Sequence, residues 1–495
     1  MQTPMLGVGG AAGTMPIGRA LSFQAGRNPD RPALSLGDVS YTRLQLDRAA
    51  NRLARDIATR GIGVGDRVAV VLPTSPVHQI TCQALWKIGA TVIPLPSRAV
   101  AAELRHLLEL ADPKLVIGVD RAGFGDWAVL PPEHQPDPAL DDSPLPDAVA
   151  GIWKASCSGG STGMPKLIFD RNASTIDPLA PMPMLQMKVD DTVLHPAPAH
   201  HTGPFCQTNW GLCWGAHIVL MERFDPHEWL RLVEKYRIRW AYMVPTMMSR
   251  VLALPTEVRK SFDVSSLEVL IHMAAPCPEW VKAAWIDWLG AAAIWETYAG
   301  TEGFGGTIIN GTEWLEHRGS VGRPQVRVRV QDDHGRPLPP GQIGGIFFQS
   351  IQSVNATGDD YRTYGDMGWV DQDGYLYLAD RRTDLILVGG ANIYPTQIEA
   401  ALMEHPAIAT AVVIGLPDED LGAQVHAVLE LRPQAAPPLA QELLGFLSQR
   451  LSRNKIPVTV EFVSGPLRDD AGKVRRSQLR AERQHVDRRS YARLR

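Results

Sequence analysis

The stretch of this chain best suited to bind a phosphate group is Ser-Gly-Gly-Ser-Thr-Gly-Met-Pro-Lys at residues 158–166. Glycines let a backbone turn its N–H groups toward an anion, and the hydroxyls of Ser161 and Thr162 add hydrogen-bond donors. Lys166 adds a compact positive charge. The stretch is not a Walker A loop, because no Gly-Lys-Ser/Thr triplet ends it. A flexible surface loop is the competing interpretation of such a glycine and serine cluster, but the Thr-Gly-x-Pro-Lys ending favours a phosphate loop.

This loop resembles the phosphate loop of the adenylate-forming superfamily, which contains acyl-CoA synthetases, nonribosomal adenylation domains and luciferases. Its usual form is Ser/Thr-Ser-Gly-Ser/Thr-Thr-Gly-x-Pro-Lys, and this chain departs from it at Gly159, which removes one hydroxyl. The resemblance implies that ATP binds here and that Thr162 helps to hold Mg²⁺. The residues that it assigns to nucleotide binding, in this loop and in a later segment, are Ser158, Gly160, Ser161, Thr162, Gly163, Lys166, Ala275 and Pro276.

A later segment, Tyr-Ala-Gly-Thr-Glu at residues 298–302, resembles the Tyr-Gly-x-Thr-Glu motif of the same superfamily, with Ala299 in place of the first glycine. The resemblance implies that Tyr298 binds the nucleotide, that Thr301 contacts the α-phosphate and that Glu302 holds Mg²⁺. A hard cation prefers carboxylate oxygens beside phosphate oxygens, so the residue types suit the task. Taken alone, Glu302 would be read as a solvated charge, but the motifs follow one another in the superfamily's order.

Two further motifs are implied to bind the ribose. Thr-Tyr-Gly-Asp at 363–366 resembles the Thr-Gly-Asp motif, spaced out by an additional tyrosine, and its Asp366 is expected to accept hydrogen bonds from both ribose hydroxyls. Asp-Arg-Arg-Thr-Asp at 380–384 resembles the opening of the superfamily's mobile C-terminal domain. Arg381 matches the arginine that contacts the ribose, and Thr383 stands at the hinge, where relatives usually have Asp or Lys.

Lys473 is the predicted catalytic lysine. It closes the stretch Pro-Leu-Arg-Asp-Asp-Ala-Gly-Lys at 466–473, which resembles the motif whose lysine completes the adenylation site. In that reaction the substrate carboxylate attacks an α-phosphate that is itself negatively charged. A flexible ammonium that contacts both groups lowers their repulsion and stabilises the charge of the transition state.

The superfamily's pocket for the carboxylic acid is matched by four segments, at 201–215, 242–247, 272–276 and 295–306. Apart from Glu296 and Glu302 they contain no acidic residue, which predicts an acid without an ammonium group, because an unpaired buried ammonium would be costly. The resemblance implies that His201 positions the carboxylate or gates entry of the thiol. The predicted acyl-pocket residues, each of which has an ordinary core position as its competing interpretation, are Phe205, Trp210, Met243, Met273 and Gly303.

The elements that must position these residues alternate between helix and strand in the first part of the chain. Apolar residues at helical spacing predict helices at 41–60, 76–88 and 101–111. Short apolar runs predict strands at 67–72, 91–95 and 114–119, and the proline-rich segment 131–146 is predicted to be irregular. Such alternation favours βαβ units and a mostly parallel, doubly wound sheet.

The pattern changes after about residue 319. From 319 to 380 short β-like runs are separated by turn residues, and beyond 385 a compact α/β pattern returns. Strands are predicted there at 385–388, 411–415, 425–431 and 459–463, with helices from 396 and at 440–452. The predicted fold is therefore α/β, with a large N-terminal adenylation domain (1–379) that includes doubly wound sheets and a β-rich subdomain, and a small, mobile α+β C-terminal domain (380–495).

The composition of the 495 residues excludes several classes of protein. With 45% hydrophobic and 21% charged residues the chain is globular, and a net charge of −4 gives no general reason to bind nucleic acid or an anionic membrane. Apolar runs stay short of the roughly 18 residues that a membrane helix needs. Five cysteines without a Cys-x-x-Cys pair favour a reducing compartment. We expect a soluble cytoplasmic protein, a monomer or a homodimer.

The reaction implied by the resemblance has two halves. A hydrophobic, bulky or cyclic carboxylic acid and MgATP give acyl-AMP and pyrophosphate, and the acyl group then passes to coenzyme A. Two alternatives remain open: direct transfer to an amine, giving an amide, and a catalytically weak nucleotide-binding relative. The departures at Gly159, Ala299 and Thr383 leave room for them. Against a dead enzyme stand four retained residues, Lys473, Glu302, Asp366 and Arg381.

Overall fold

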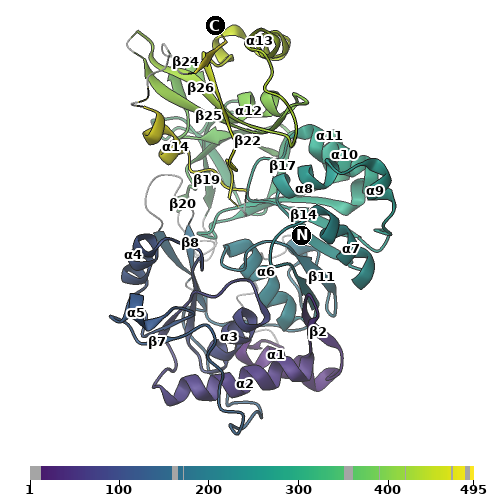
Figure 1. The fold of residues 1–495 in the computed structure, drawn as a ribbon, viewed down its shortest axis with the longest axis vertical. Helices are drawn as coiled ribbons and strands as arrows, with labels where there is room; N and C mark the ends of the chain where they lie inside the picture. Colours follow the sequence, from purple (N-terminus) through teal and green to yellow (C-terminus); the bar gives the residue numbers. More distant parts are fainter. Residues whose placement is uncertain are drawn as a thin grey trace. The chain divides into compact units, whose positions relative to one another are not determined.

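The computed structural model describes residues 13–158, 166–170, 172–349, 360–388, 391–418, 420–469, 472–484, 486 and 491–494 (Figure 1). The chain divides into two compact units, which are described separately. The first consists of Met1–Gly159, Met164–Met243 and Met247–His272, and the second of Gly160–Gly163, Val244–Thr246 and Met273–Arg495. Within the described ranges no helix combines the length and the apolar character needed to cross a membrane.

The first unit contains a six-stranded sheet that is parallel except at one edge. Its strands, in spatial order, are β7 (Val129–Leu130), β6 (Leu115–Ile117), β4 (Arg67–Val70), β5 (Thr91–Pro94), β8 (Lys154–Ser158) and β9 (Lys166–Asp170). Only the last pair, β8 and β9, is antiparallel. Helices α3 (Pro76–Lys87) and α4 (Ala101–Ala111) provide crossovers between parallel strands. This confirms the doubly wound pattern expected for the first part of the chain, and residues 131–146 form neither helix nor strand.

A second set of strands in the first unit follows the order β14 (Val269–His272), β13 (Trp240–Met243), β11 (Thr192–His195), β12 (His217–Leu220), β2 (Pro32–Leu36) and β3 (Val39–Thr42). All neighbours are parallel except β2 and β3. Helix α2 (Arg43–Thr59) begins at a capping box formed by Thr42 and Gln45, and this confirms the helix predicted at 41–60. The other helices are α1 (Ile17–Arg27), α5 (Arg121–Phe124), α6 (Thr202–Cys213), α7 (Pro226–Tyr236), α8 (Pro245–Leu252) and α9 (Thr256–Lys260).

The second unit begins with an antiparallel sheet. Its strands, in spatial order, are β18 (Val328–Gln331), β19 (Gly344–Gln349), β21 (Asp366–Val370), β22 (Leu376–Arg381), β17 (Ser320–Pro324), β16 (Gly306–Asn310) and β15 (Ile294–Ala299), with β20 (Tyr361–Arg362) beside β19. Helices α10 (Glu279–Leu289) and α11 (Gly311–Glu316) accompany it. Short strands separated by turns were expected between 319 and 380, and the structure confirms them.

The end of the second unit has its own sheet and core. Its four-stranded sheet has the order β25 (Ile408–Asp418), β26 (Gly422–Leu431), β27 (Thr459–Val463) and β28 (Ala492–Arg493), beside the hairpin of β23 (Ile386–Val388) and β24 (Ala391–Ile393). Helices α12 (Pro395–Met403) and α13 (Ala440–Ser448) pack on a buried aliphatic core, and α14 (Arg476–Arg483) follows. The predicted domain boundary at 379/380 falls within β22.

The five cysteines of the chain carry free thiols. Cys82, Cys206 and Cys213 are buried, whereas Cys157 and Cys277 are half-buried. The chain thus relies on its apolar cores rather than on disulfide cross-links.

Candidate functional site

Within the second unit the structure brings together three of the residues that are predicted to bind the nucleotide. Asp366 begins β21 and lies opposite Arg381 on β22 in the strand register. The hydroxyl of Tyr298, on β15, donates to Asp366 Oδ2 at 2.6 Å, and Arg381 Nε donates to Asp366 Oδ1 at 3.2 Å. The Asp366 side chain is 13% exposed and that of Arg381 is 46% exposed, so the pair reaches from the interior to solvent.

Burial and neighbouring charges shift the pKa values of Asp366 and Tyr298. Burial raises the pKa of Asp366, although the neighbouring guanidinium of Arg381 acts in the opposite direction. Burial and the Asp366 carboxylate raise the pKa of Tyr298 well above its ordinary value, so this phenol stays a hydrogen-bond donor. A carboxylate has about four acceptor positions. Asp366 uses one on each oxygen here, and the same group can also accept from sugar hydroxyls.

Thr301 and Glu302 lie in the connection between β15 and β16. Gly303 turns this connection with φ +69°, and its N–H donates to the carbonyl of Gly300 at 3.1 Å. Thr301 is half-buried and Glu302 is exposed. An exposed carboxylate suits a magnesium ion that must also bind phosphate oxygens and water. The donor set therefore fits the metal role predicted for Glu302.

The predicted phosphate loop is flanked by two paired strands. β8 ends at Ser158 and β9 begins at Lys166, and these two residues face each other in an antiparallel register. Lys166 is exposed. The residues that follow the loop thus form β9. Four predicted nucleotide residues lie outside the described residues, namely Gly160, Ser161, Thr162 and Gly163.

Lys473 lies at the end of a tight turn. Its N–H donates to Asp469 Oδ1 at 2.8 Å, and the N–H of Asp469 donates back to its carbonyl at 2.9 Å. Gly472 has φ +76°, and a methyl group built on it would lie 3.5 Å from Val244 Cβ and from Thr246 Oγ1. Val244 and Thr246 belong to the segment 242–247 that was predicted to line the acid pocket. Within the second unit, Gly472, which precedes the predicted catalytic lysine, therefore lies close to Val244 and Thr246.

An ionic cluster around Glu399 fixes the surroundings of the lysine turn. Glu399, on α12, has a side chain only 3% exposed. It accepts from Arg476 Nη2 at 2.5 Å and from the N–H of Val413 at 2.8 Å, and Arg468 lies 3.6 Å away. Arg476 also donates to Asp384 Oδ2 at 3.1 Å. Since Asp384 follows the exposed Thr383, the cluster connects the predicted hinge to the residues on both sides of Lys473.

The predicted acyl-pocket residues are distributed over both units. Phe205 is fully buried, with its ring 5.8 Å from that of Trp86 and 6.1 Å from that of Trp153. Trp210 is half-buried and stacks on Trp153 at 5.5 Å. Met243, the last residue of β13, is also fully buried. The surroundings of Phe205 and Met243 are those of core residues, and their acyl-pocket role stays a prediction.

Other predicted site residues lie at the ends of elements. His201 is the N-cap residue of α6, and its ring is 4.2 Å from that of His200. Met273, Ala275 and Pro276 follow β14 in a segment where Ala274 has φ +75°, a left-handed conformation uncommon for a residue with a side chain. Strained backbone of this kind is concentrated at functional sites.

A buried ion pair that sequence reasoning missed neutralises Glu296. Lys282 Nζ, on α10, donates to Glu296 Oε2 at 2.6 Å, and the Lys282 side chain is 1% exposed. No periodicity or motif connects these two residues. The pairing leaves Glu296 committed to a lysine of the chain, which supports the prediction of a substrate without an ammonium group.

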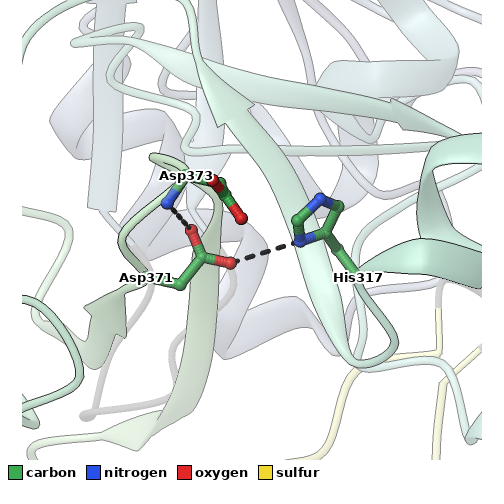
Figure 2. A group of neighbouring side chains, drawn as sticks. All are labelled: His317, Asp371 and Asp373. Carbon is green, nitrogen blue, oxygen red and sulfur yellow. Dashed lines mark hydrogen bonds and ion pairs between the residues drawn. The ribbon is translucent and has the colours of Figure 1, made fainter.

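His317, Asp371 and Asp373 form a cluster that resembles a metal site (Figure 2). His317 Nδ1 lies 3.3 Å from Asp371 Oδ2, and the N–H of Asp373 donates to Asp371 Oδ1 at 3.0 Å. Asp371 also accepts from the N–H of Tyr375 at 2.9 Å and from the hydroxyl of Tyr377 at 3.1 Å. Both carboxylate oxygens thus already serve the turn between β21 and β22, and we assign the cluster a structural role.

Comparison with known proteins agrees with this geometry. Residues 21–355 match the family model of the AMP-binding enzymes, and residues 397–473 match the model of the AMP-binding enzyme C-terminal domain. The feruloyl-CoA synthase of an Amycolatopsis species is 29% identical over 493 residues, which cover 94% of this chain and 98% of that protein.

Two of the solved structures that share the fold illustrate the similarity. The o-succinylbenzoate CoA synthetase of Bacillus subtilis, in complex with its acyl-adenylate intermediate, has a TM-score of 0.80 and 22% identity over 94% of this chain and 98% of its own. The amide bond synthetase of Marinactinospora thermotolerans has a TM-score of 0.78 and 24% identity over 94% of this chain and 100% of its own. The family models together span most of the chain. The chain belongs to the AMP-binding enzyme family.

Proposed function

We propose that this protein activates a hydrophobic carboxylic acid with MgATP and transfers the acyl group to coenzyme A. The observation that carries the proposal is the trio of Tyr298, Asp366 and Arg381, joined by hydrogen bonds of 2.6 and 3.2 Å. A partly buried carboxylate beside a guanidinium suits the two hydroxyls of a ribose. The matched family models and the feruloyl-CoA synthase relative support the same reaction class.

In the first half-reaction an oxygen of the substrate carboxylate attacks the α-phosphorus of ATP, and pyrophosphate leaves with the electron pair of the broken P–O bond. Asp366 and Arg381 hold the ribose, and Thr301 contacts the α-phosphate. Glu302, with Thr162, would hold the magnesium ion, which would supply positive charge to the polyphosphate. Lys473 brings its ammonium group between the carboxylate and the α-phosphate, where it stabilises the charge of the transition state.

In the second half-reaction the sulfur of coenzyme A attacks the carbonyl carbon of the acyl-AMP, the thiol proton is released and AMP leaves. The mixed anhydride makes this attack possible, because AMP is a far better leaving group than the oxide or hydroxide that a free carboxylate would have to expel. We assign the reorientation between the two halves to Thr383, which is exposed and can absorb a change of backbone dihedral angles. His201 orients the acyl group during transfer.

The pocket chemistry favours an acid with a ring or another bulky apolar group. The ion pair between Lys282 and Glu296 leaves no anionic partner for an ammonium at Glu296. Gly303 adds no side-chain volume to the connection that follows Glu302, and a Cβ atom built on it would meet nothing within 4 Å. The feruloyl-CoA synthase relative acts, by its name, on an acid of this kind.

The test is pyrophosphate exchange over a library of aromatic, alicyclic, aliphatic and amino acids. We expect exchange with apolar ring-containing acids and none with α-amino acids. Mass spectrometry of products formed with coenzyme A should then show the acyl thioester. Absence of exchange for every acid would instead favour a nucleotide-binding protein.

An amine acceptor is the second candidate, and Thr383 is the observation that favours it. The residue replaces the Asp or Lys expected at the hinge, so the reorientation that admits coenzyme A can differ here. The same reactions supplied with a panel of amines in place of coenzyme A distinguish the two acceptors. Amide formation without thioester formation would overturn the proposal for coenzyme A.

A further inference from the structure

Tyr364 contacts the connection that bears Thr301 and Glu302, although it lies 59 residues further along the chain than Gly305. Its hydroxyl accepts from the N–H of Gly305 at 3.0 Å and donates to the carbonyl of the same residue at 2.8 Å. The N–H and the carbonyl of Gly305 are therefore both hydrogen-bonded to one phenol hydroxyl. Because these bonds involve backbone atoms, they constrain the path of the connection itself.

The ring of Tyr364 packs on the same connection. It stacks on Phe304 with ring centroids 5.3 Å apart and planes inclined by 13°. It also meets the ring of Tyr298 edge to face at 6.2 Å, and Tyr298 is the residue that donates to Asp366. Tyr364 thus touches both the connection of Glu302 and a hydrogen-bond partner of the predicted ribose carboxylate.

Gly300 shows how closely the ring approaches. A Cβ atom built on Gly300 would lie 2.2 Å from Cε1 of Tyr364 and 2.8 Å from Glu302 Oε2. A side chain at position 300 and a tyrosine at position 364 are therefore mutually exclusive without movement of the backbone. The glycine belongs to the motif of Glu302, and the tyrosine is the additional residue that spaces out the motif of Asp366.

We propose that Tyr364 is a positioning residue that holds Thr301 and Glu302 at a fixed distance from Asp366. The inference rests on the proposed function. MgATP must contact the ribose carboxylate and the magnesium ligand at the same time, and misplacement of a reacting group by about 1 Å can lower a rate by about 100-fold. Tyr364 occurs two residues before Asp366, so one short segment fixes both ends of the nucleotide site.

The variant Tyr364→Phe tests the hydroxyl, because it keeps the stacking and loses both hydrogen bonds to Gly305. We expect kcat of pyrophosphate exchange to fall roughly 10- to 100-fold. The KM for ATP should change little, because Asp366 and Arg381 stay in place, and the Mg²⁺ concentration for half-maximal rate should rise. Tyr361→Phe, on β20, is the matched control and should leave all three quantities unchanged. Wild-type kcat and Mg²⁺ dependence in Tyr364→Phe would overturn the proposal.

Hydrogen exchange of the ligand-free protein tests the contact independently of activity. In Tyr364→Phe, the peptide that contains Gly305 should exchange faster than in the wild type, whereas Tyr361→Phe should not alter it. If the wild type showed no pyrophosphate exchange with any acid, the proposed function would fail while this measurement still decided whether Tyr364 holds the connection. Unchanged hydrogen exchange of this peptide in Tyr364→Phe would show that Tyr364 does not hold the connection.

The close approach of the Tyr364 ring to Gly300 is tested by making Gly300→Ala in two backgrounds. Gly300→Ala should lower the melting temperature of the wild type, because the added methyl group collides with Tyr364. In the Tyr364→Leu background the same substitution should lower the melting temperature clearly less, since the smaller leucine side chain leaves space for the methyl group. Equal losses in the two backgrounds would contradict the close approach of the ring to Gly300.

Discussion

At the scale of single residues, a substitution of Lys473 tests the proposed chemistry most directly. We predict that Lys473→Ala slows acyl-AMP formation by about 3–4 kcal/mol of barrier, by analogy with the removal of other charge-stabilising donors in transition states. The measurement is pyrophosphate exchange with the best acid substrate. Lys455→Ala is the control, because Lys455 binds Gln397 at 2.8 Å in the same part of the chain and has no catalytic assignment. Near-normal exchange by Lys473→Ala would refute the role.

Asp366 allows a prediction about pH. Asp366→Asn should raise the KM for ATP roughly 10- to 100-fold, because hydrogen bonds to a charged group contribute about 1.5–3 kcal/mol. Burial raises the pKa of Asp366, so on acidification this carboxyl is protonated before an ordinary aspartate and loses acceptor strength. Binding of ATP to the wild type should therefore weaken as the pH falls through that pKa. Asp366→Asn should lack this dependence, whereas Glu316→Gln, an exposed change on α11, should retain it.

Short sequence motifs predicted part of the site, and there is a physical reason why they did not predict the rest. The trio of Tyr298, Asp366 and Arg381 was predicted from short contiguous motifs, and the structure joins its members by hydrogen bonds. Lys282 and the contacts of Tyr364 were not predicted. Both depend on contacts between separate elements, 14 and 59 residues apart, that form only when the second unit folds, and no local pattern records such contacts.

At the scale of elements, the ion pairs around Glu399 should stabilise the end of the second unit. Removing one partner of a buried ion pair leaves an uncompensated charge, so Glu399→Ala should lower the free energy of unfolding by about 3–5 kcal/mol. The double variant Glu399→Ala/Arg476→Ala should lose less than the sum of the single changes. Urea unfolding measures both. The control Glu442→Ala removes a carboxylate that is 58% exposed beside His405 and should cost under about 1 kcal/mol. Additive losses would contradict the cluster.

Secondary structure was predicted best where the pattern is local. Helix α2 agrees with its apolar spacing, and its start is fixed by the capping box at Thr42. β25 was predicted at 411–415 but extends over Ile408–Asp418, because it pairs with β26 along nearly its whole length. The helix predicted at 440–452 ends at Ser448. Tertiary pairing and helix ends override local preference in these two cases.

At the scale of the whole molecule, two buried histidines and one half-buried histidine of the first unit predict sensitivity to acid. Burial lowers the pKa of His78 to about 3 and those of His195 and His217 to about 4. In the unfolded chain each titrates near about 6.5. Between these values the unfolded state binds protons that the native state does not, so the free energy of unfolding decreases as the pH falls from about 6.5 toward 4.

The measurement is the free energy of unfolding at several pH values in this window. His78→Gln should give a shallower decrease than the wild type, because one of the three proton-binding differences is removed. His227→Gln, which changes an exposed histidine, should reproduce the wild-type slope. Parallel curves for wild type and His78→Gln would show that His78 is not held neutral in the native state.

The free thiols have a consequence for an enzyme whose proposed co-substrate is itself a thiol. Burial raises the pKa of Cys206 and of Cys213 to about 12, and it also raises that of Cys82. A thiolate is required for attack on a disulfide, and at neutral pH these three sulfurs stay protonated and inaccessible. Oxidised coenzyme A can therefore accumulate around the protein during oxidative stress without becoming covalently attached to these positions.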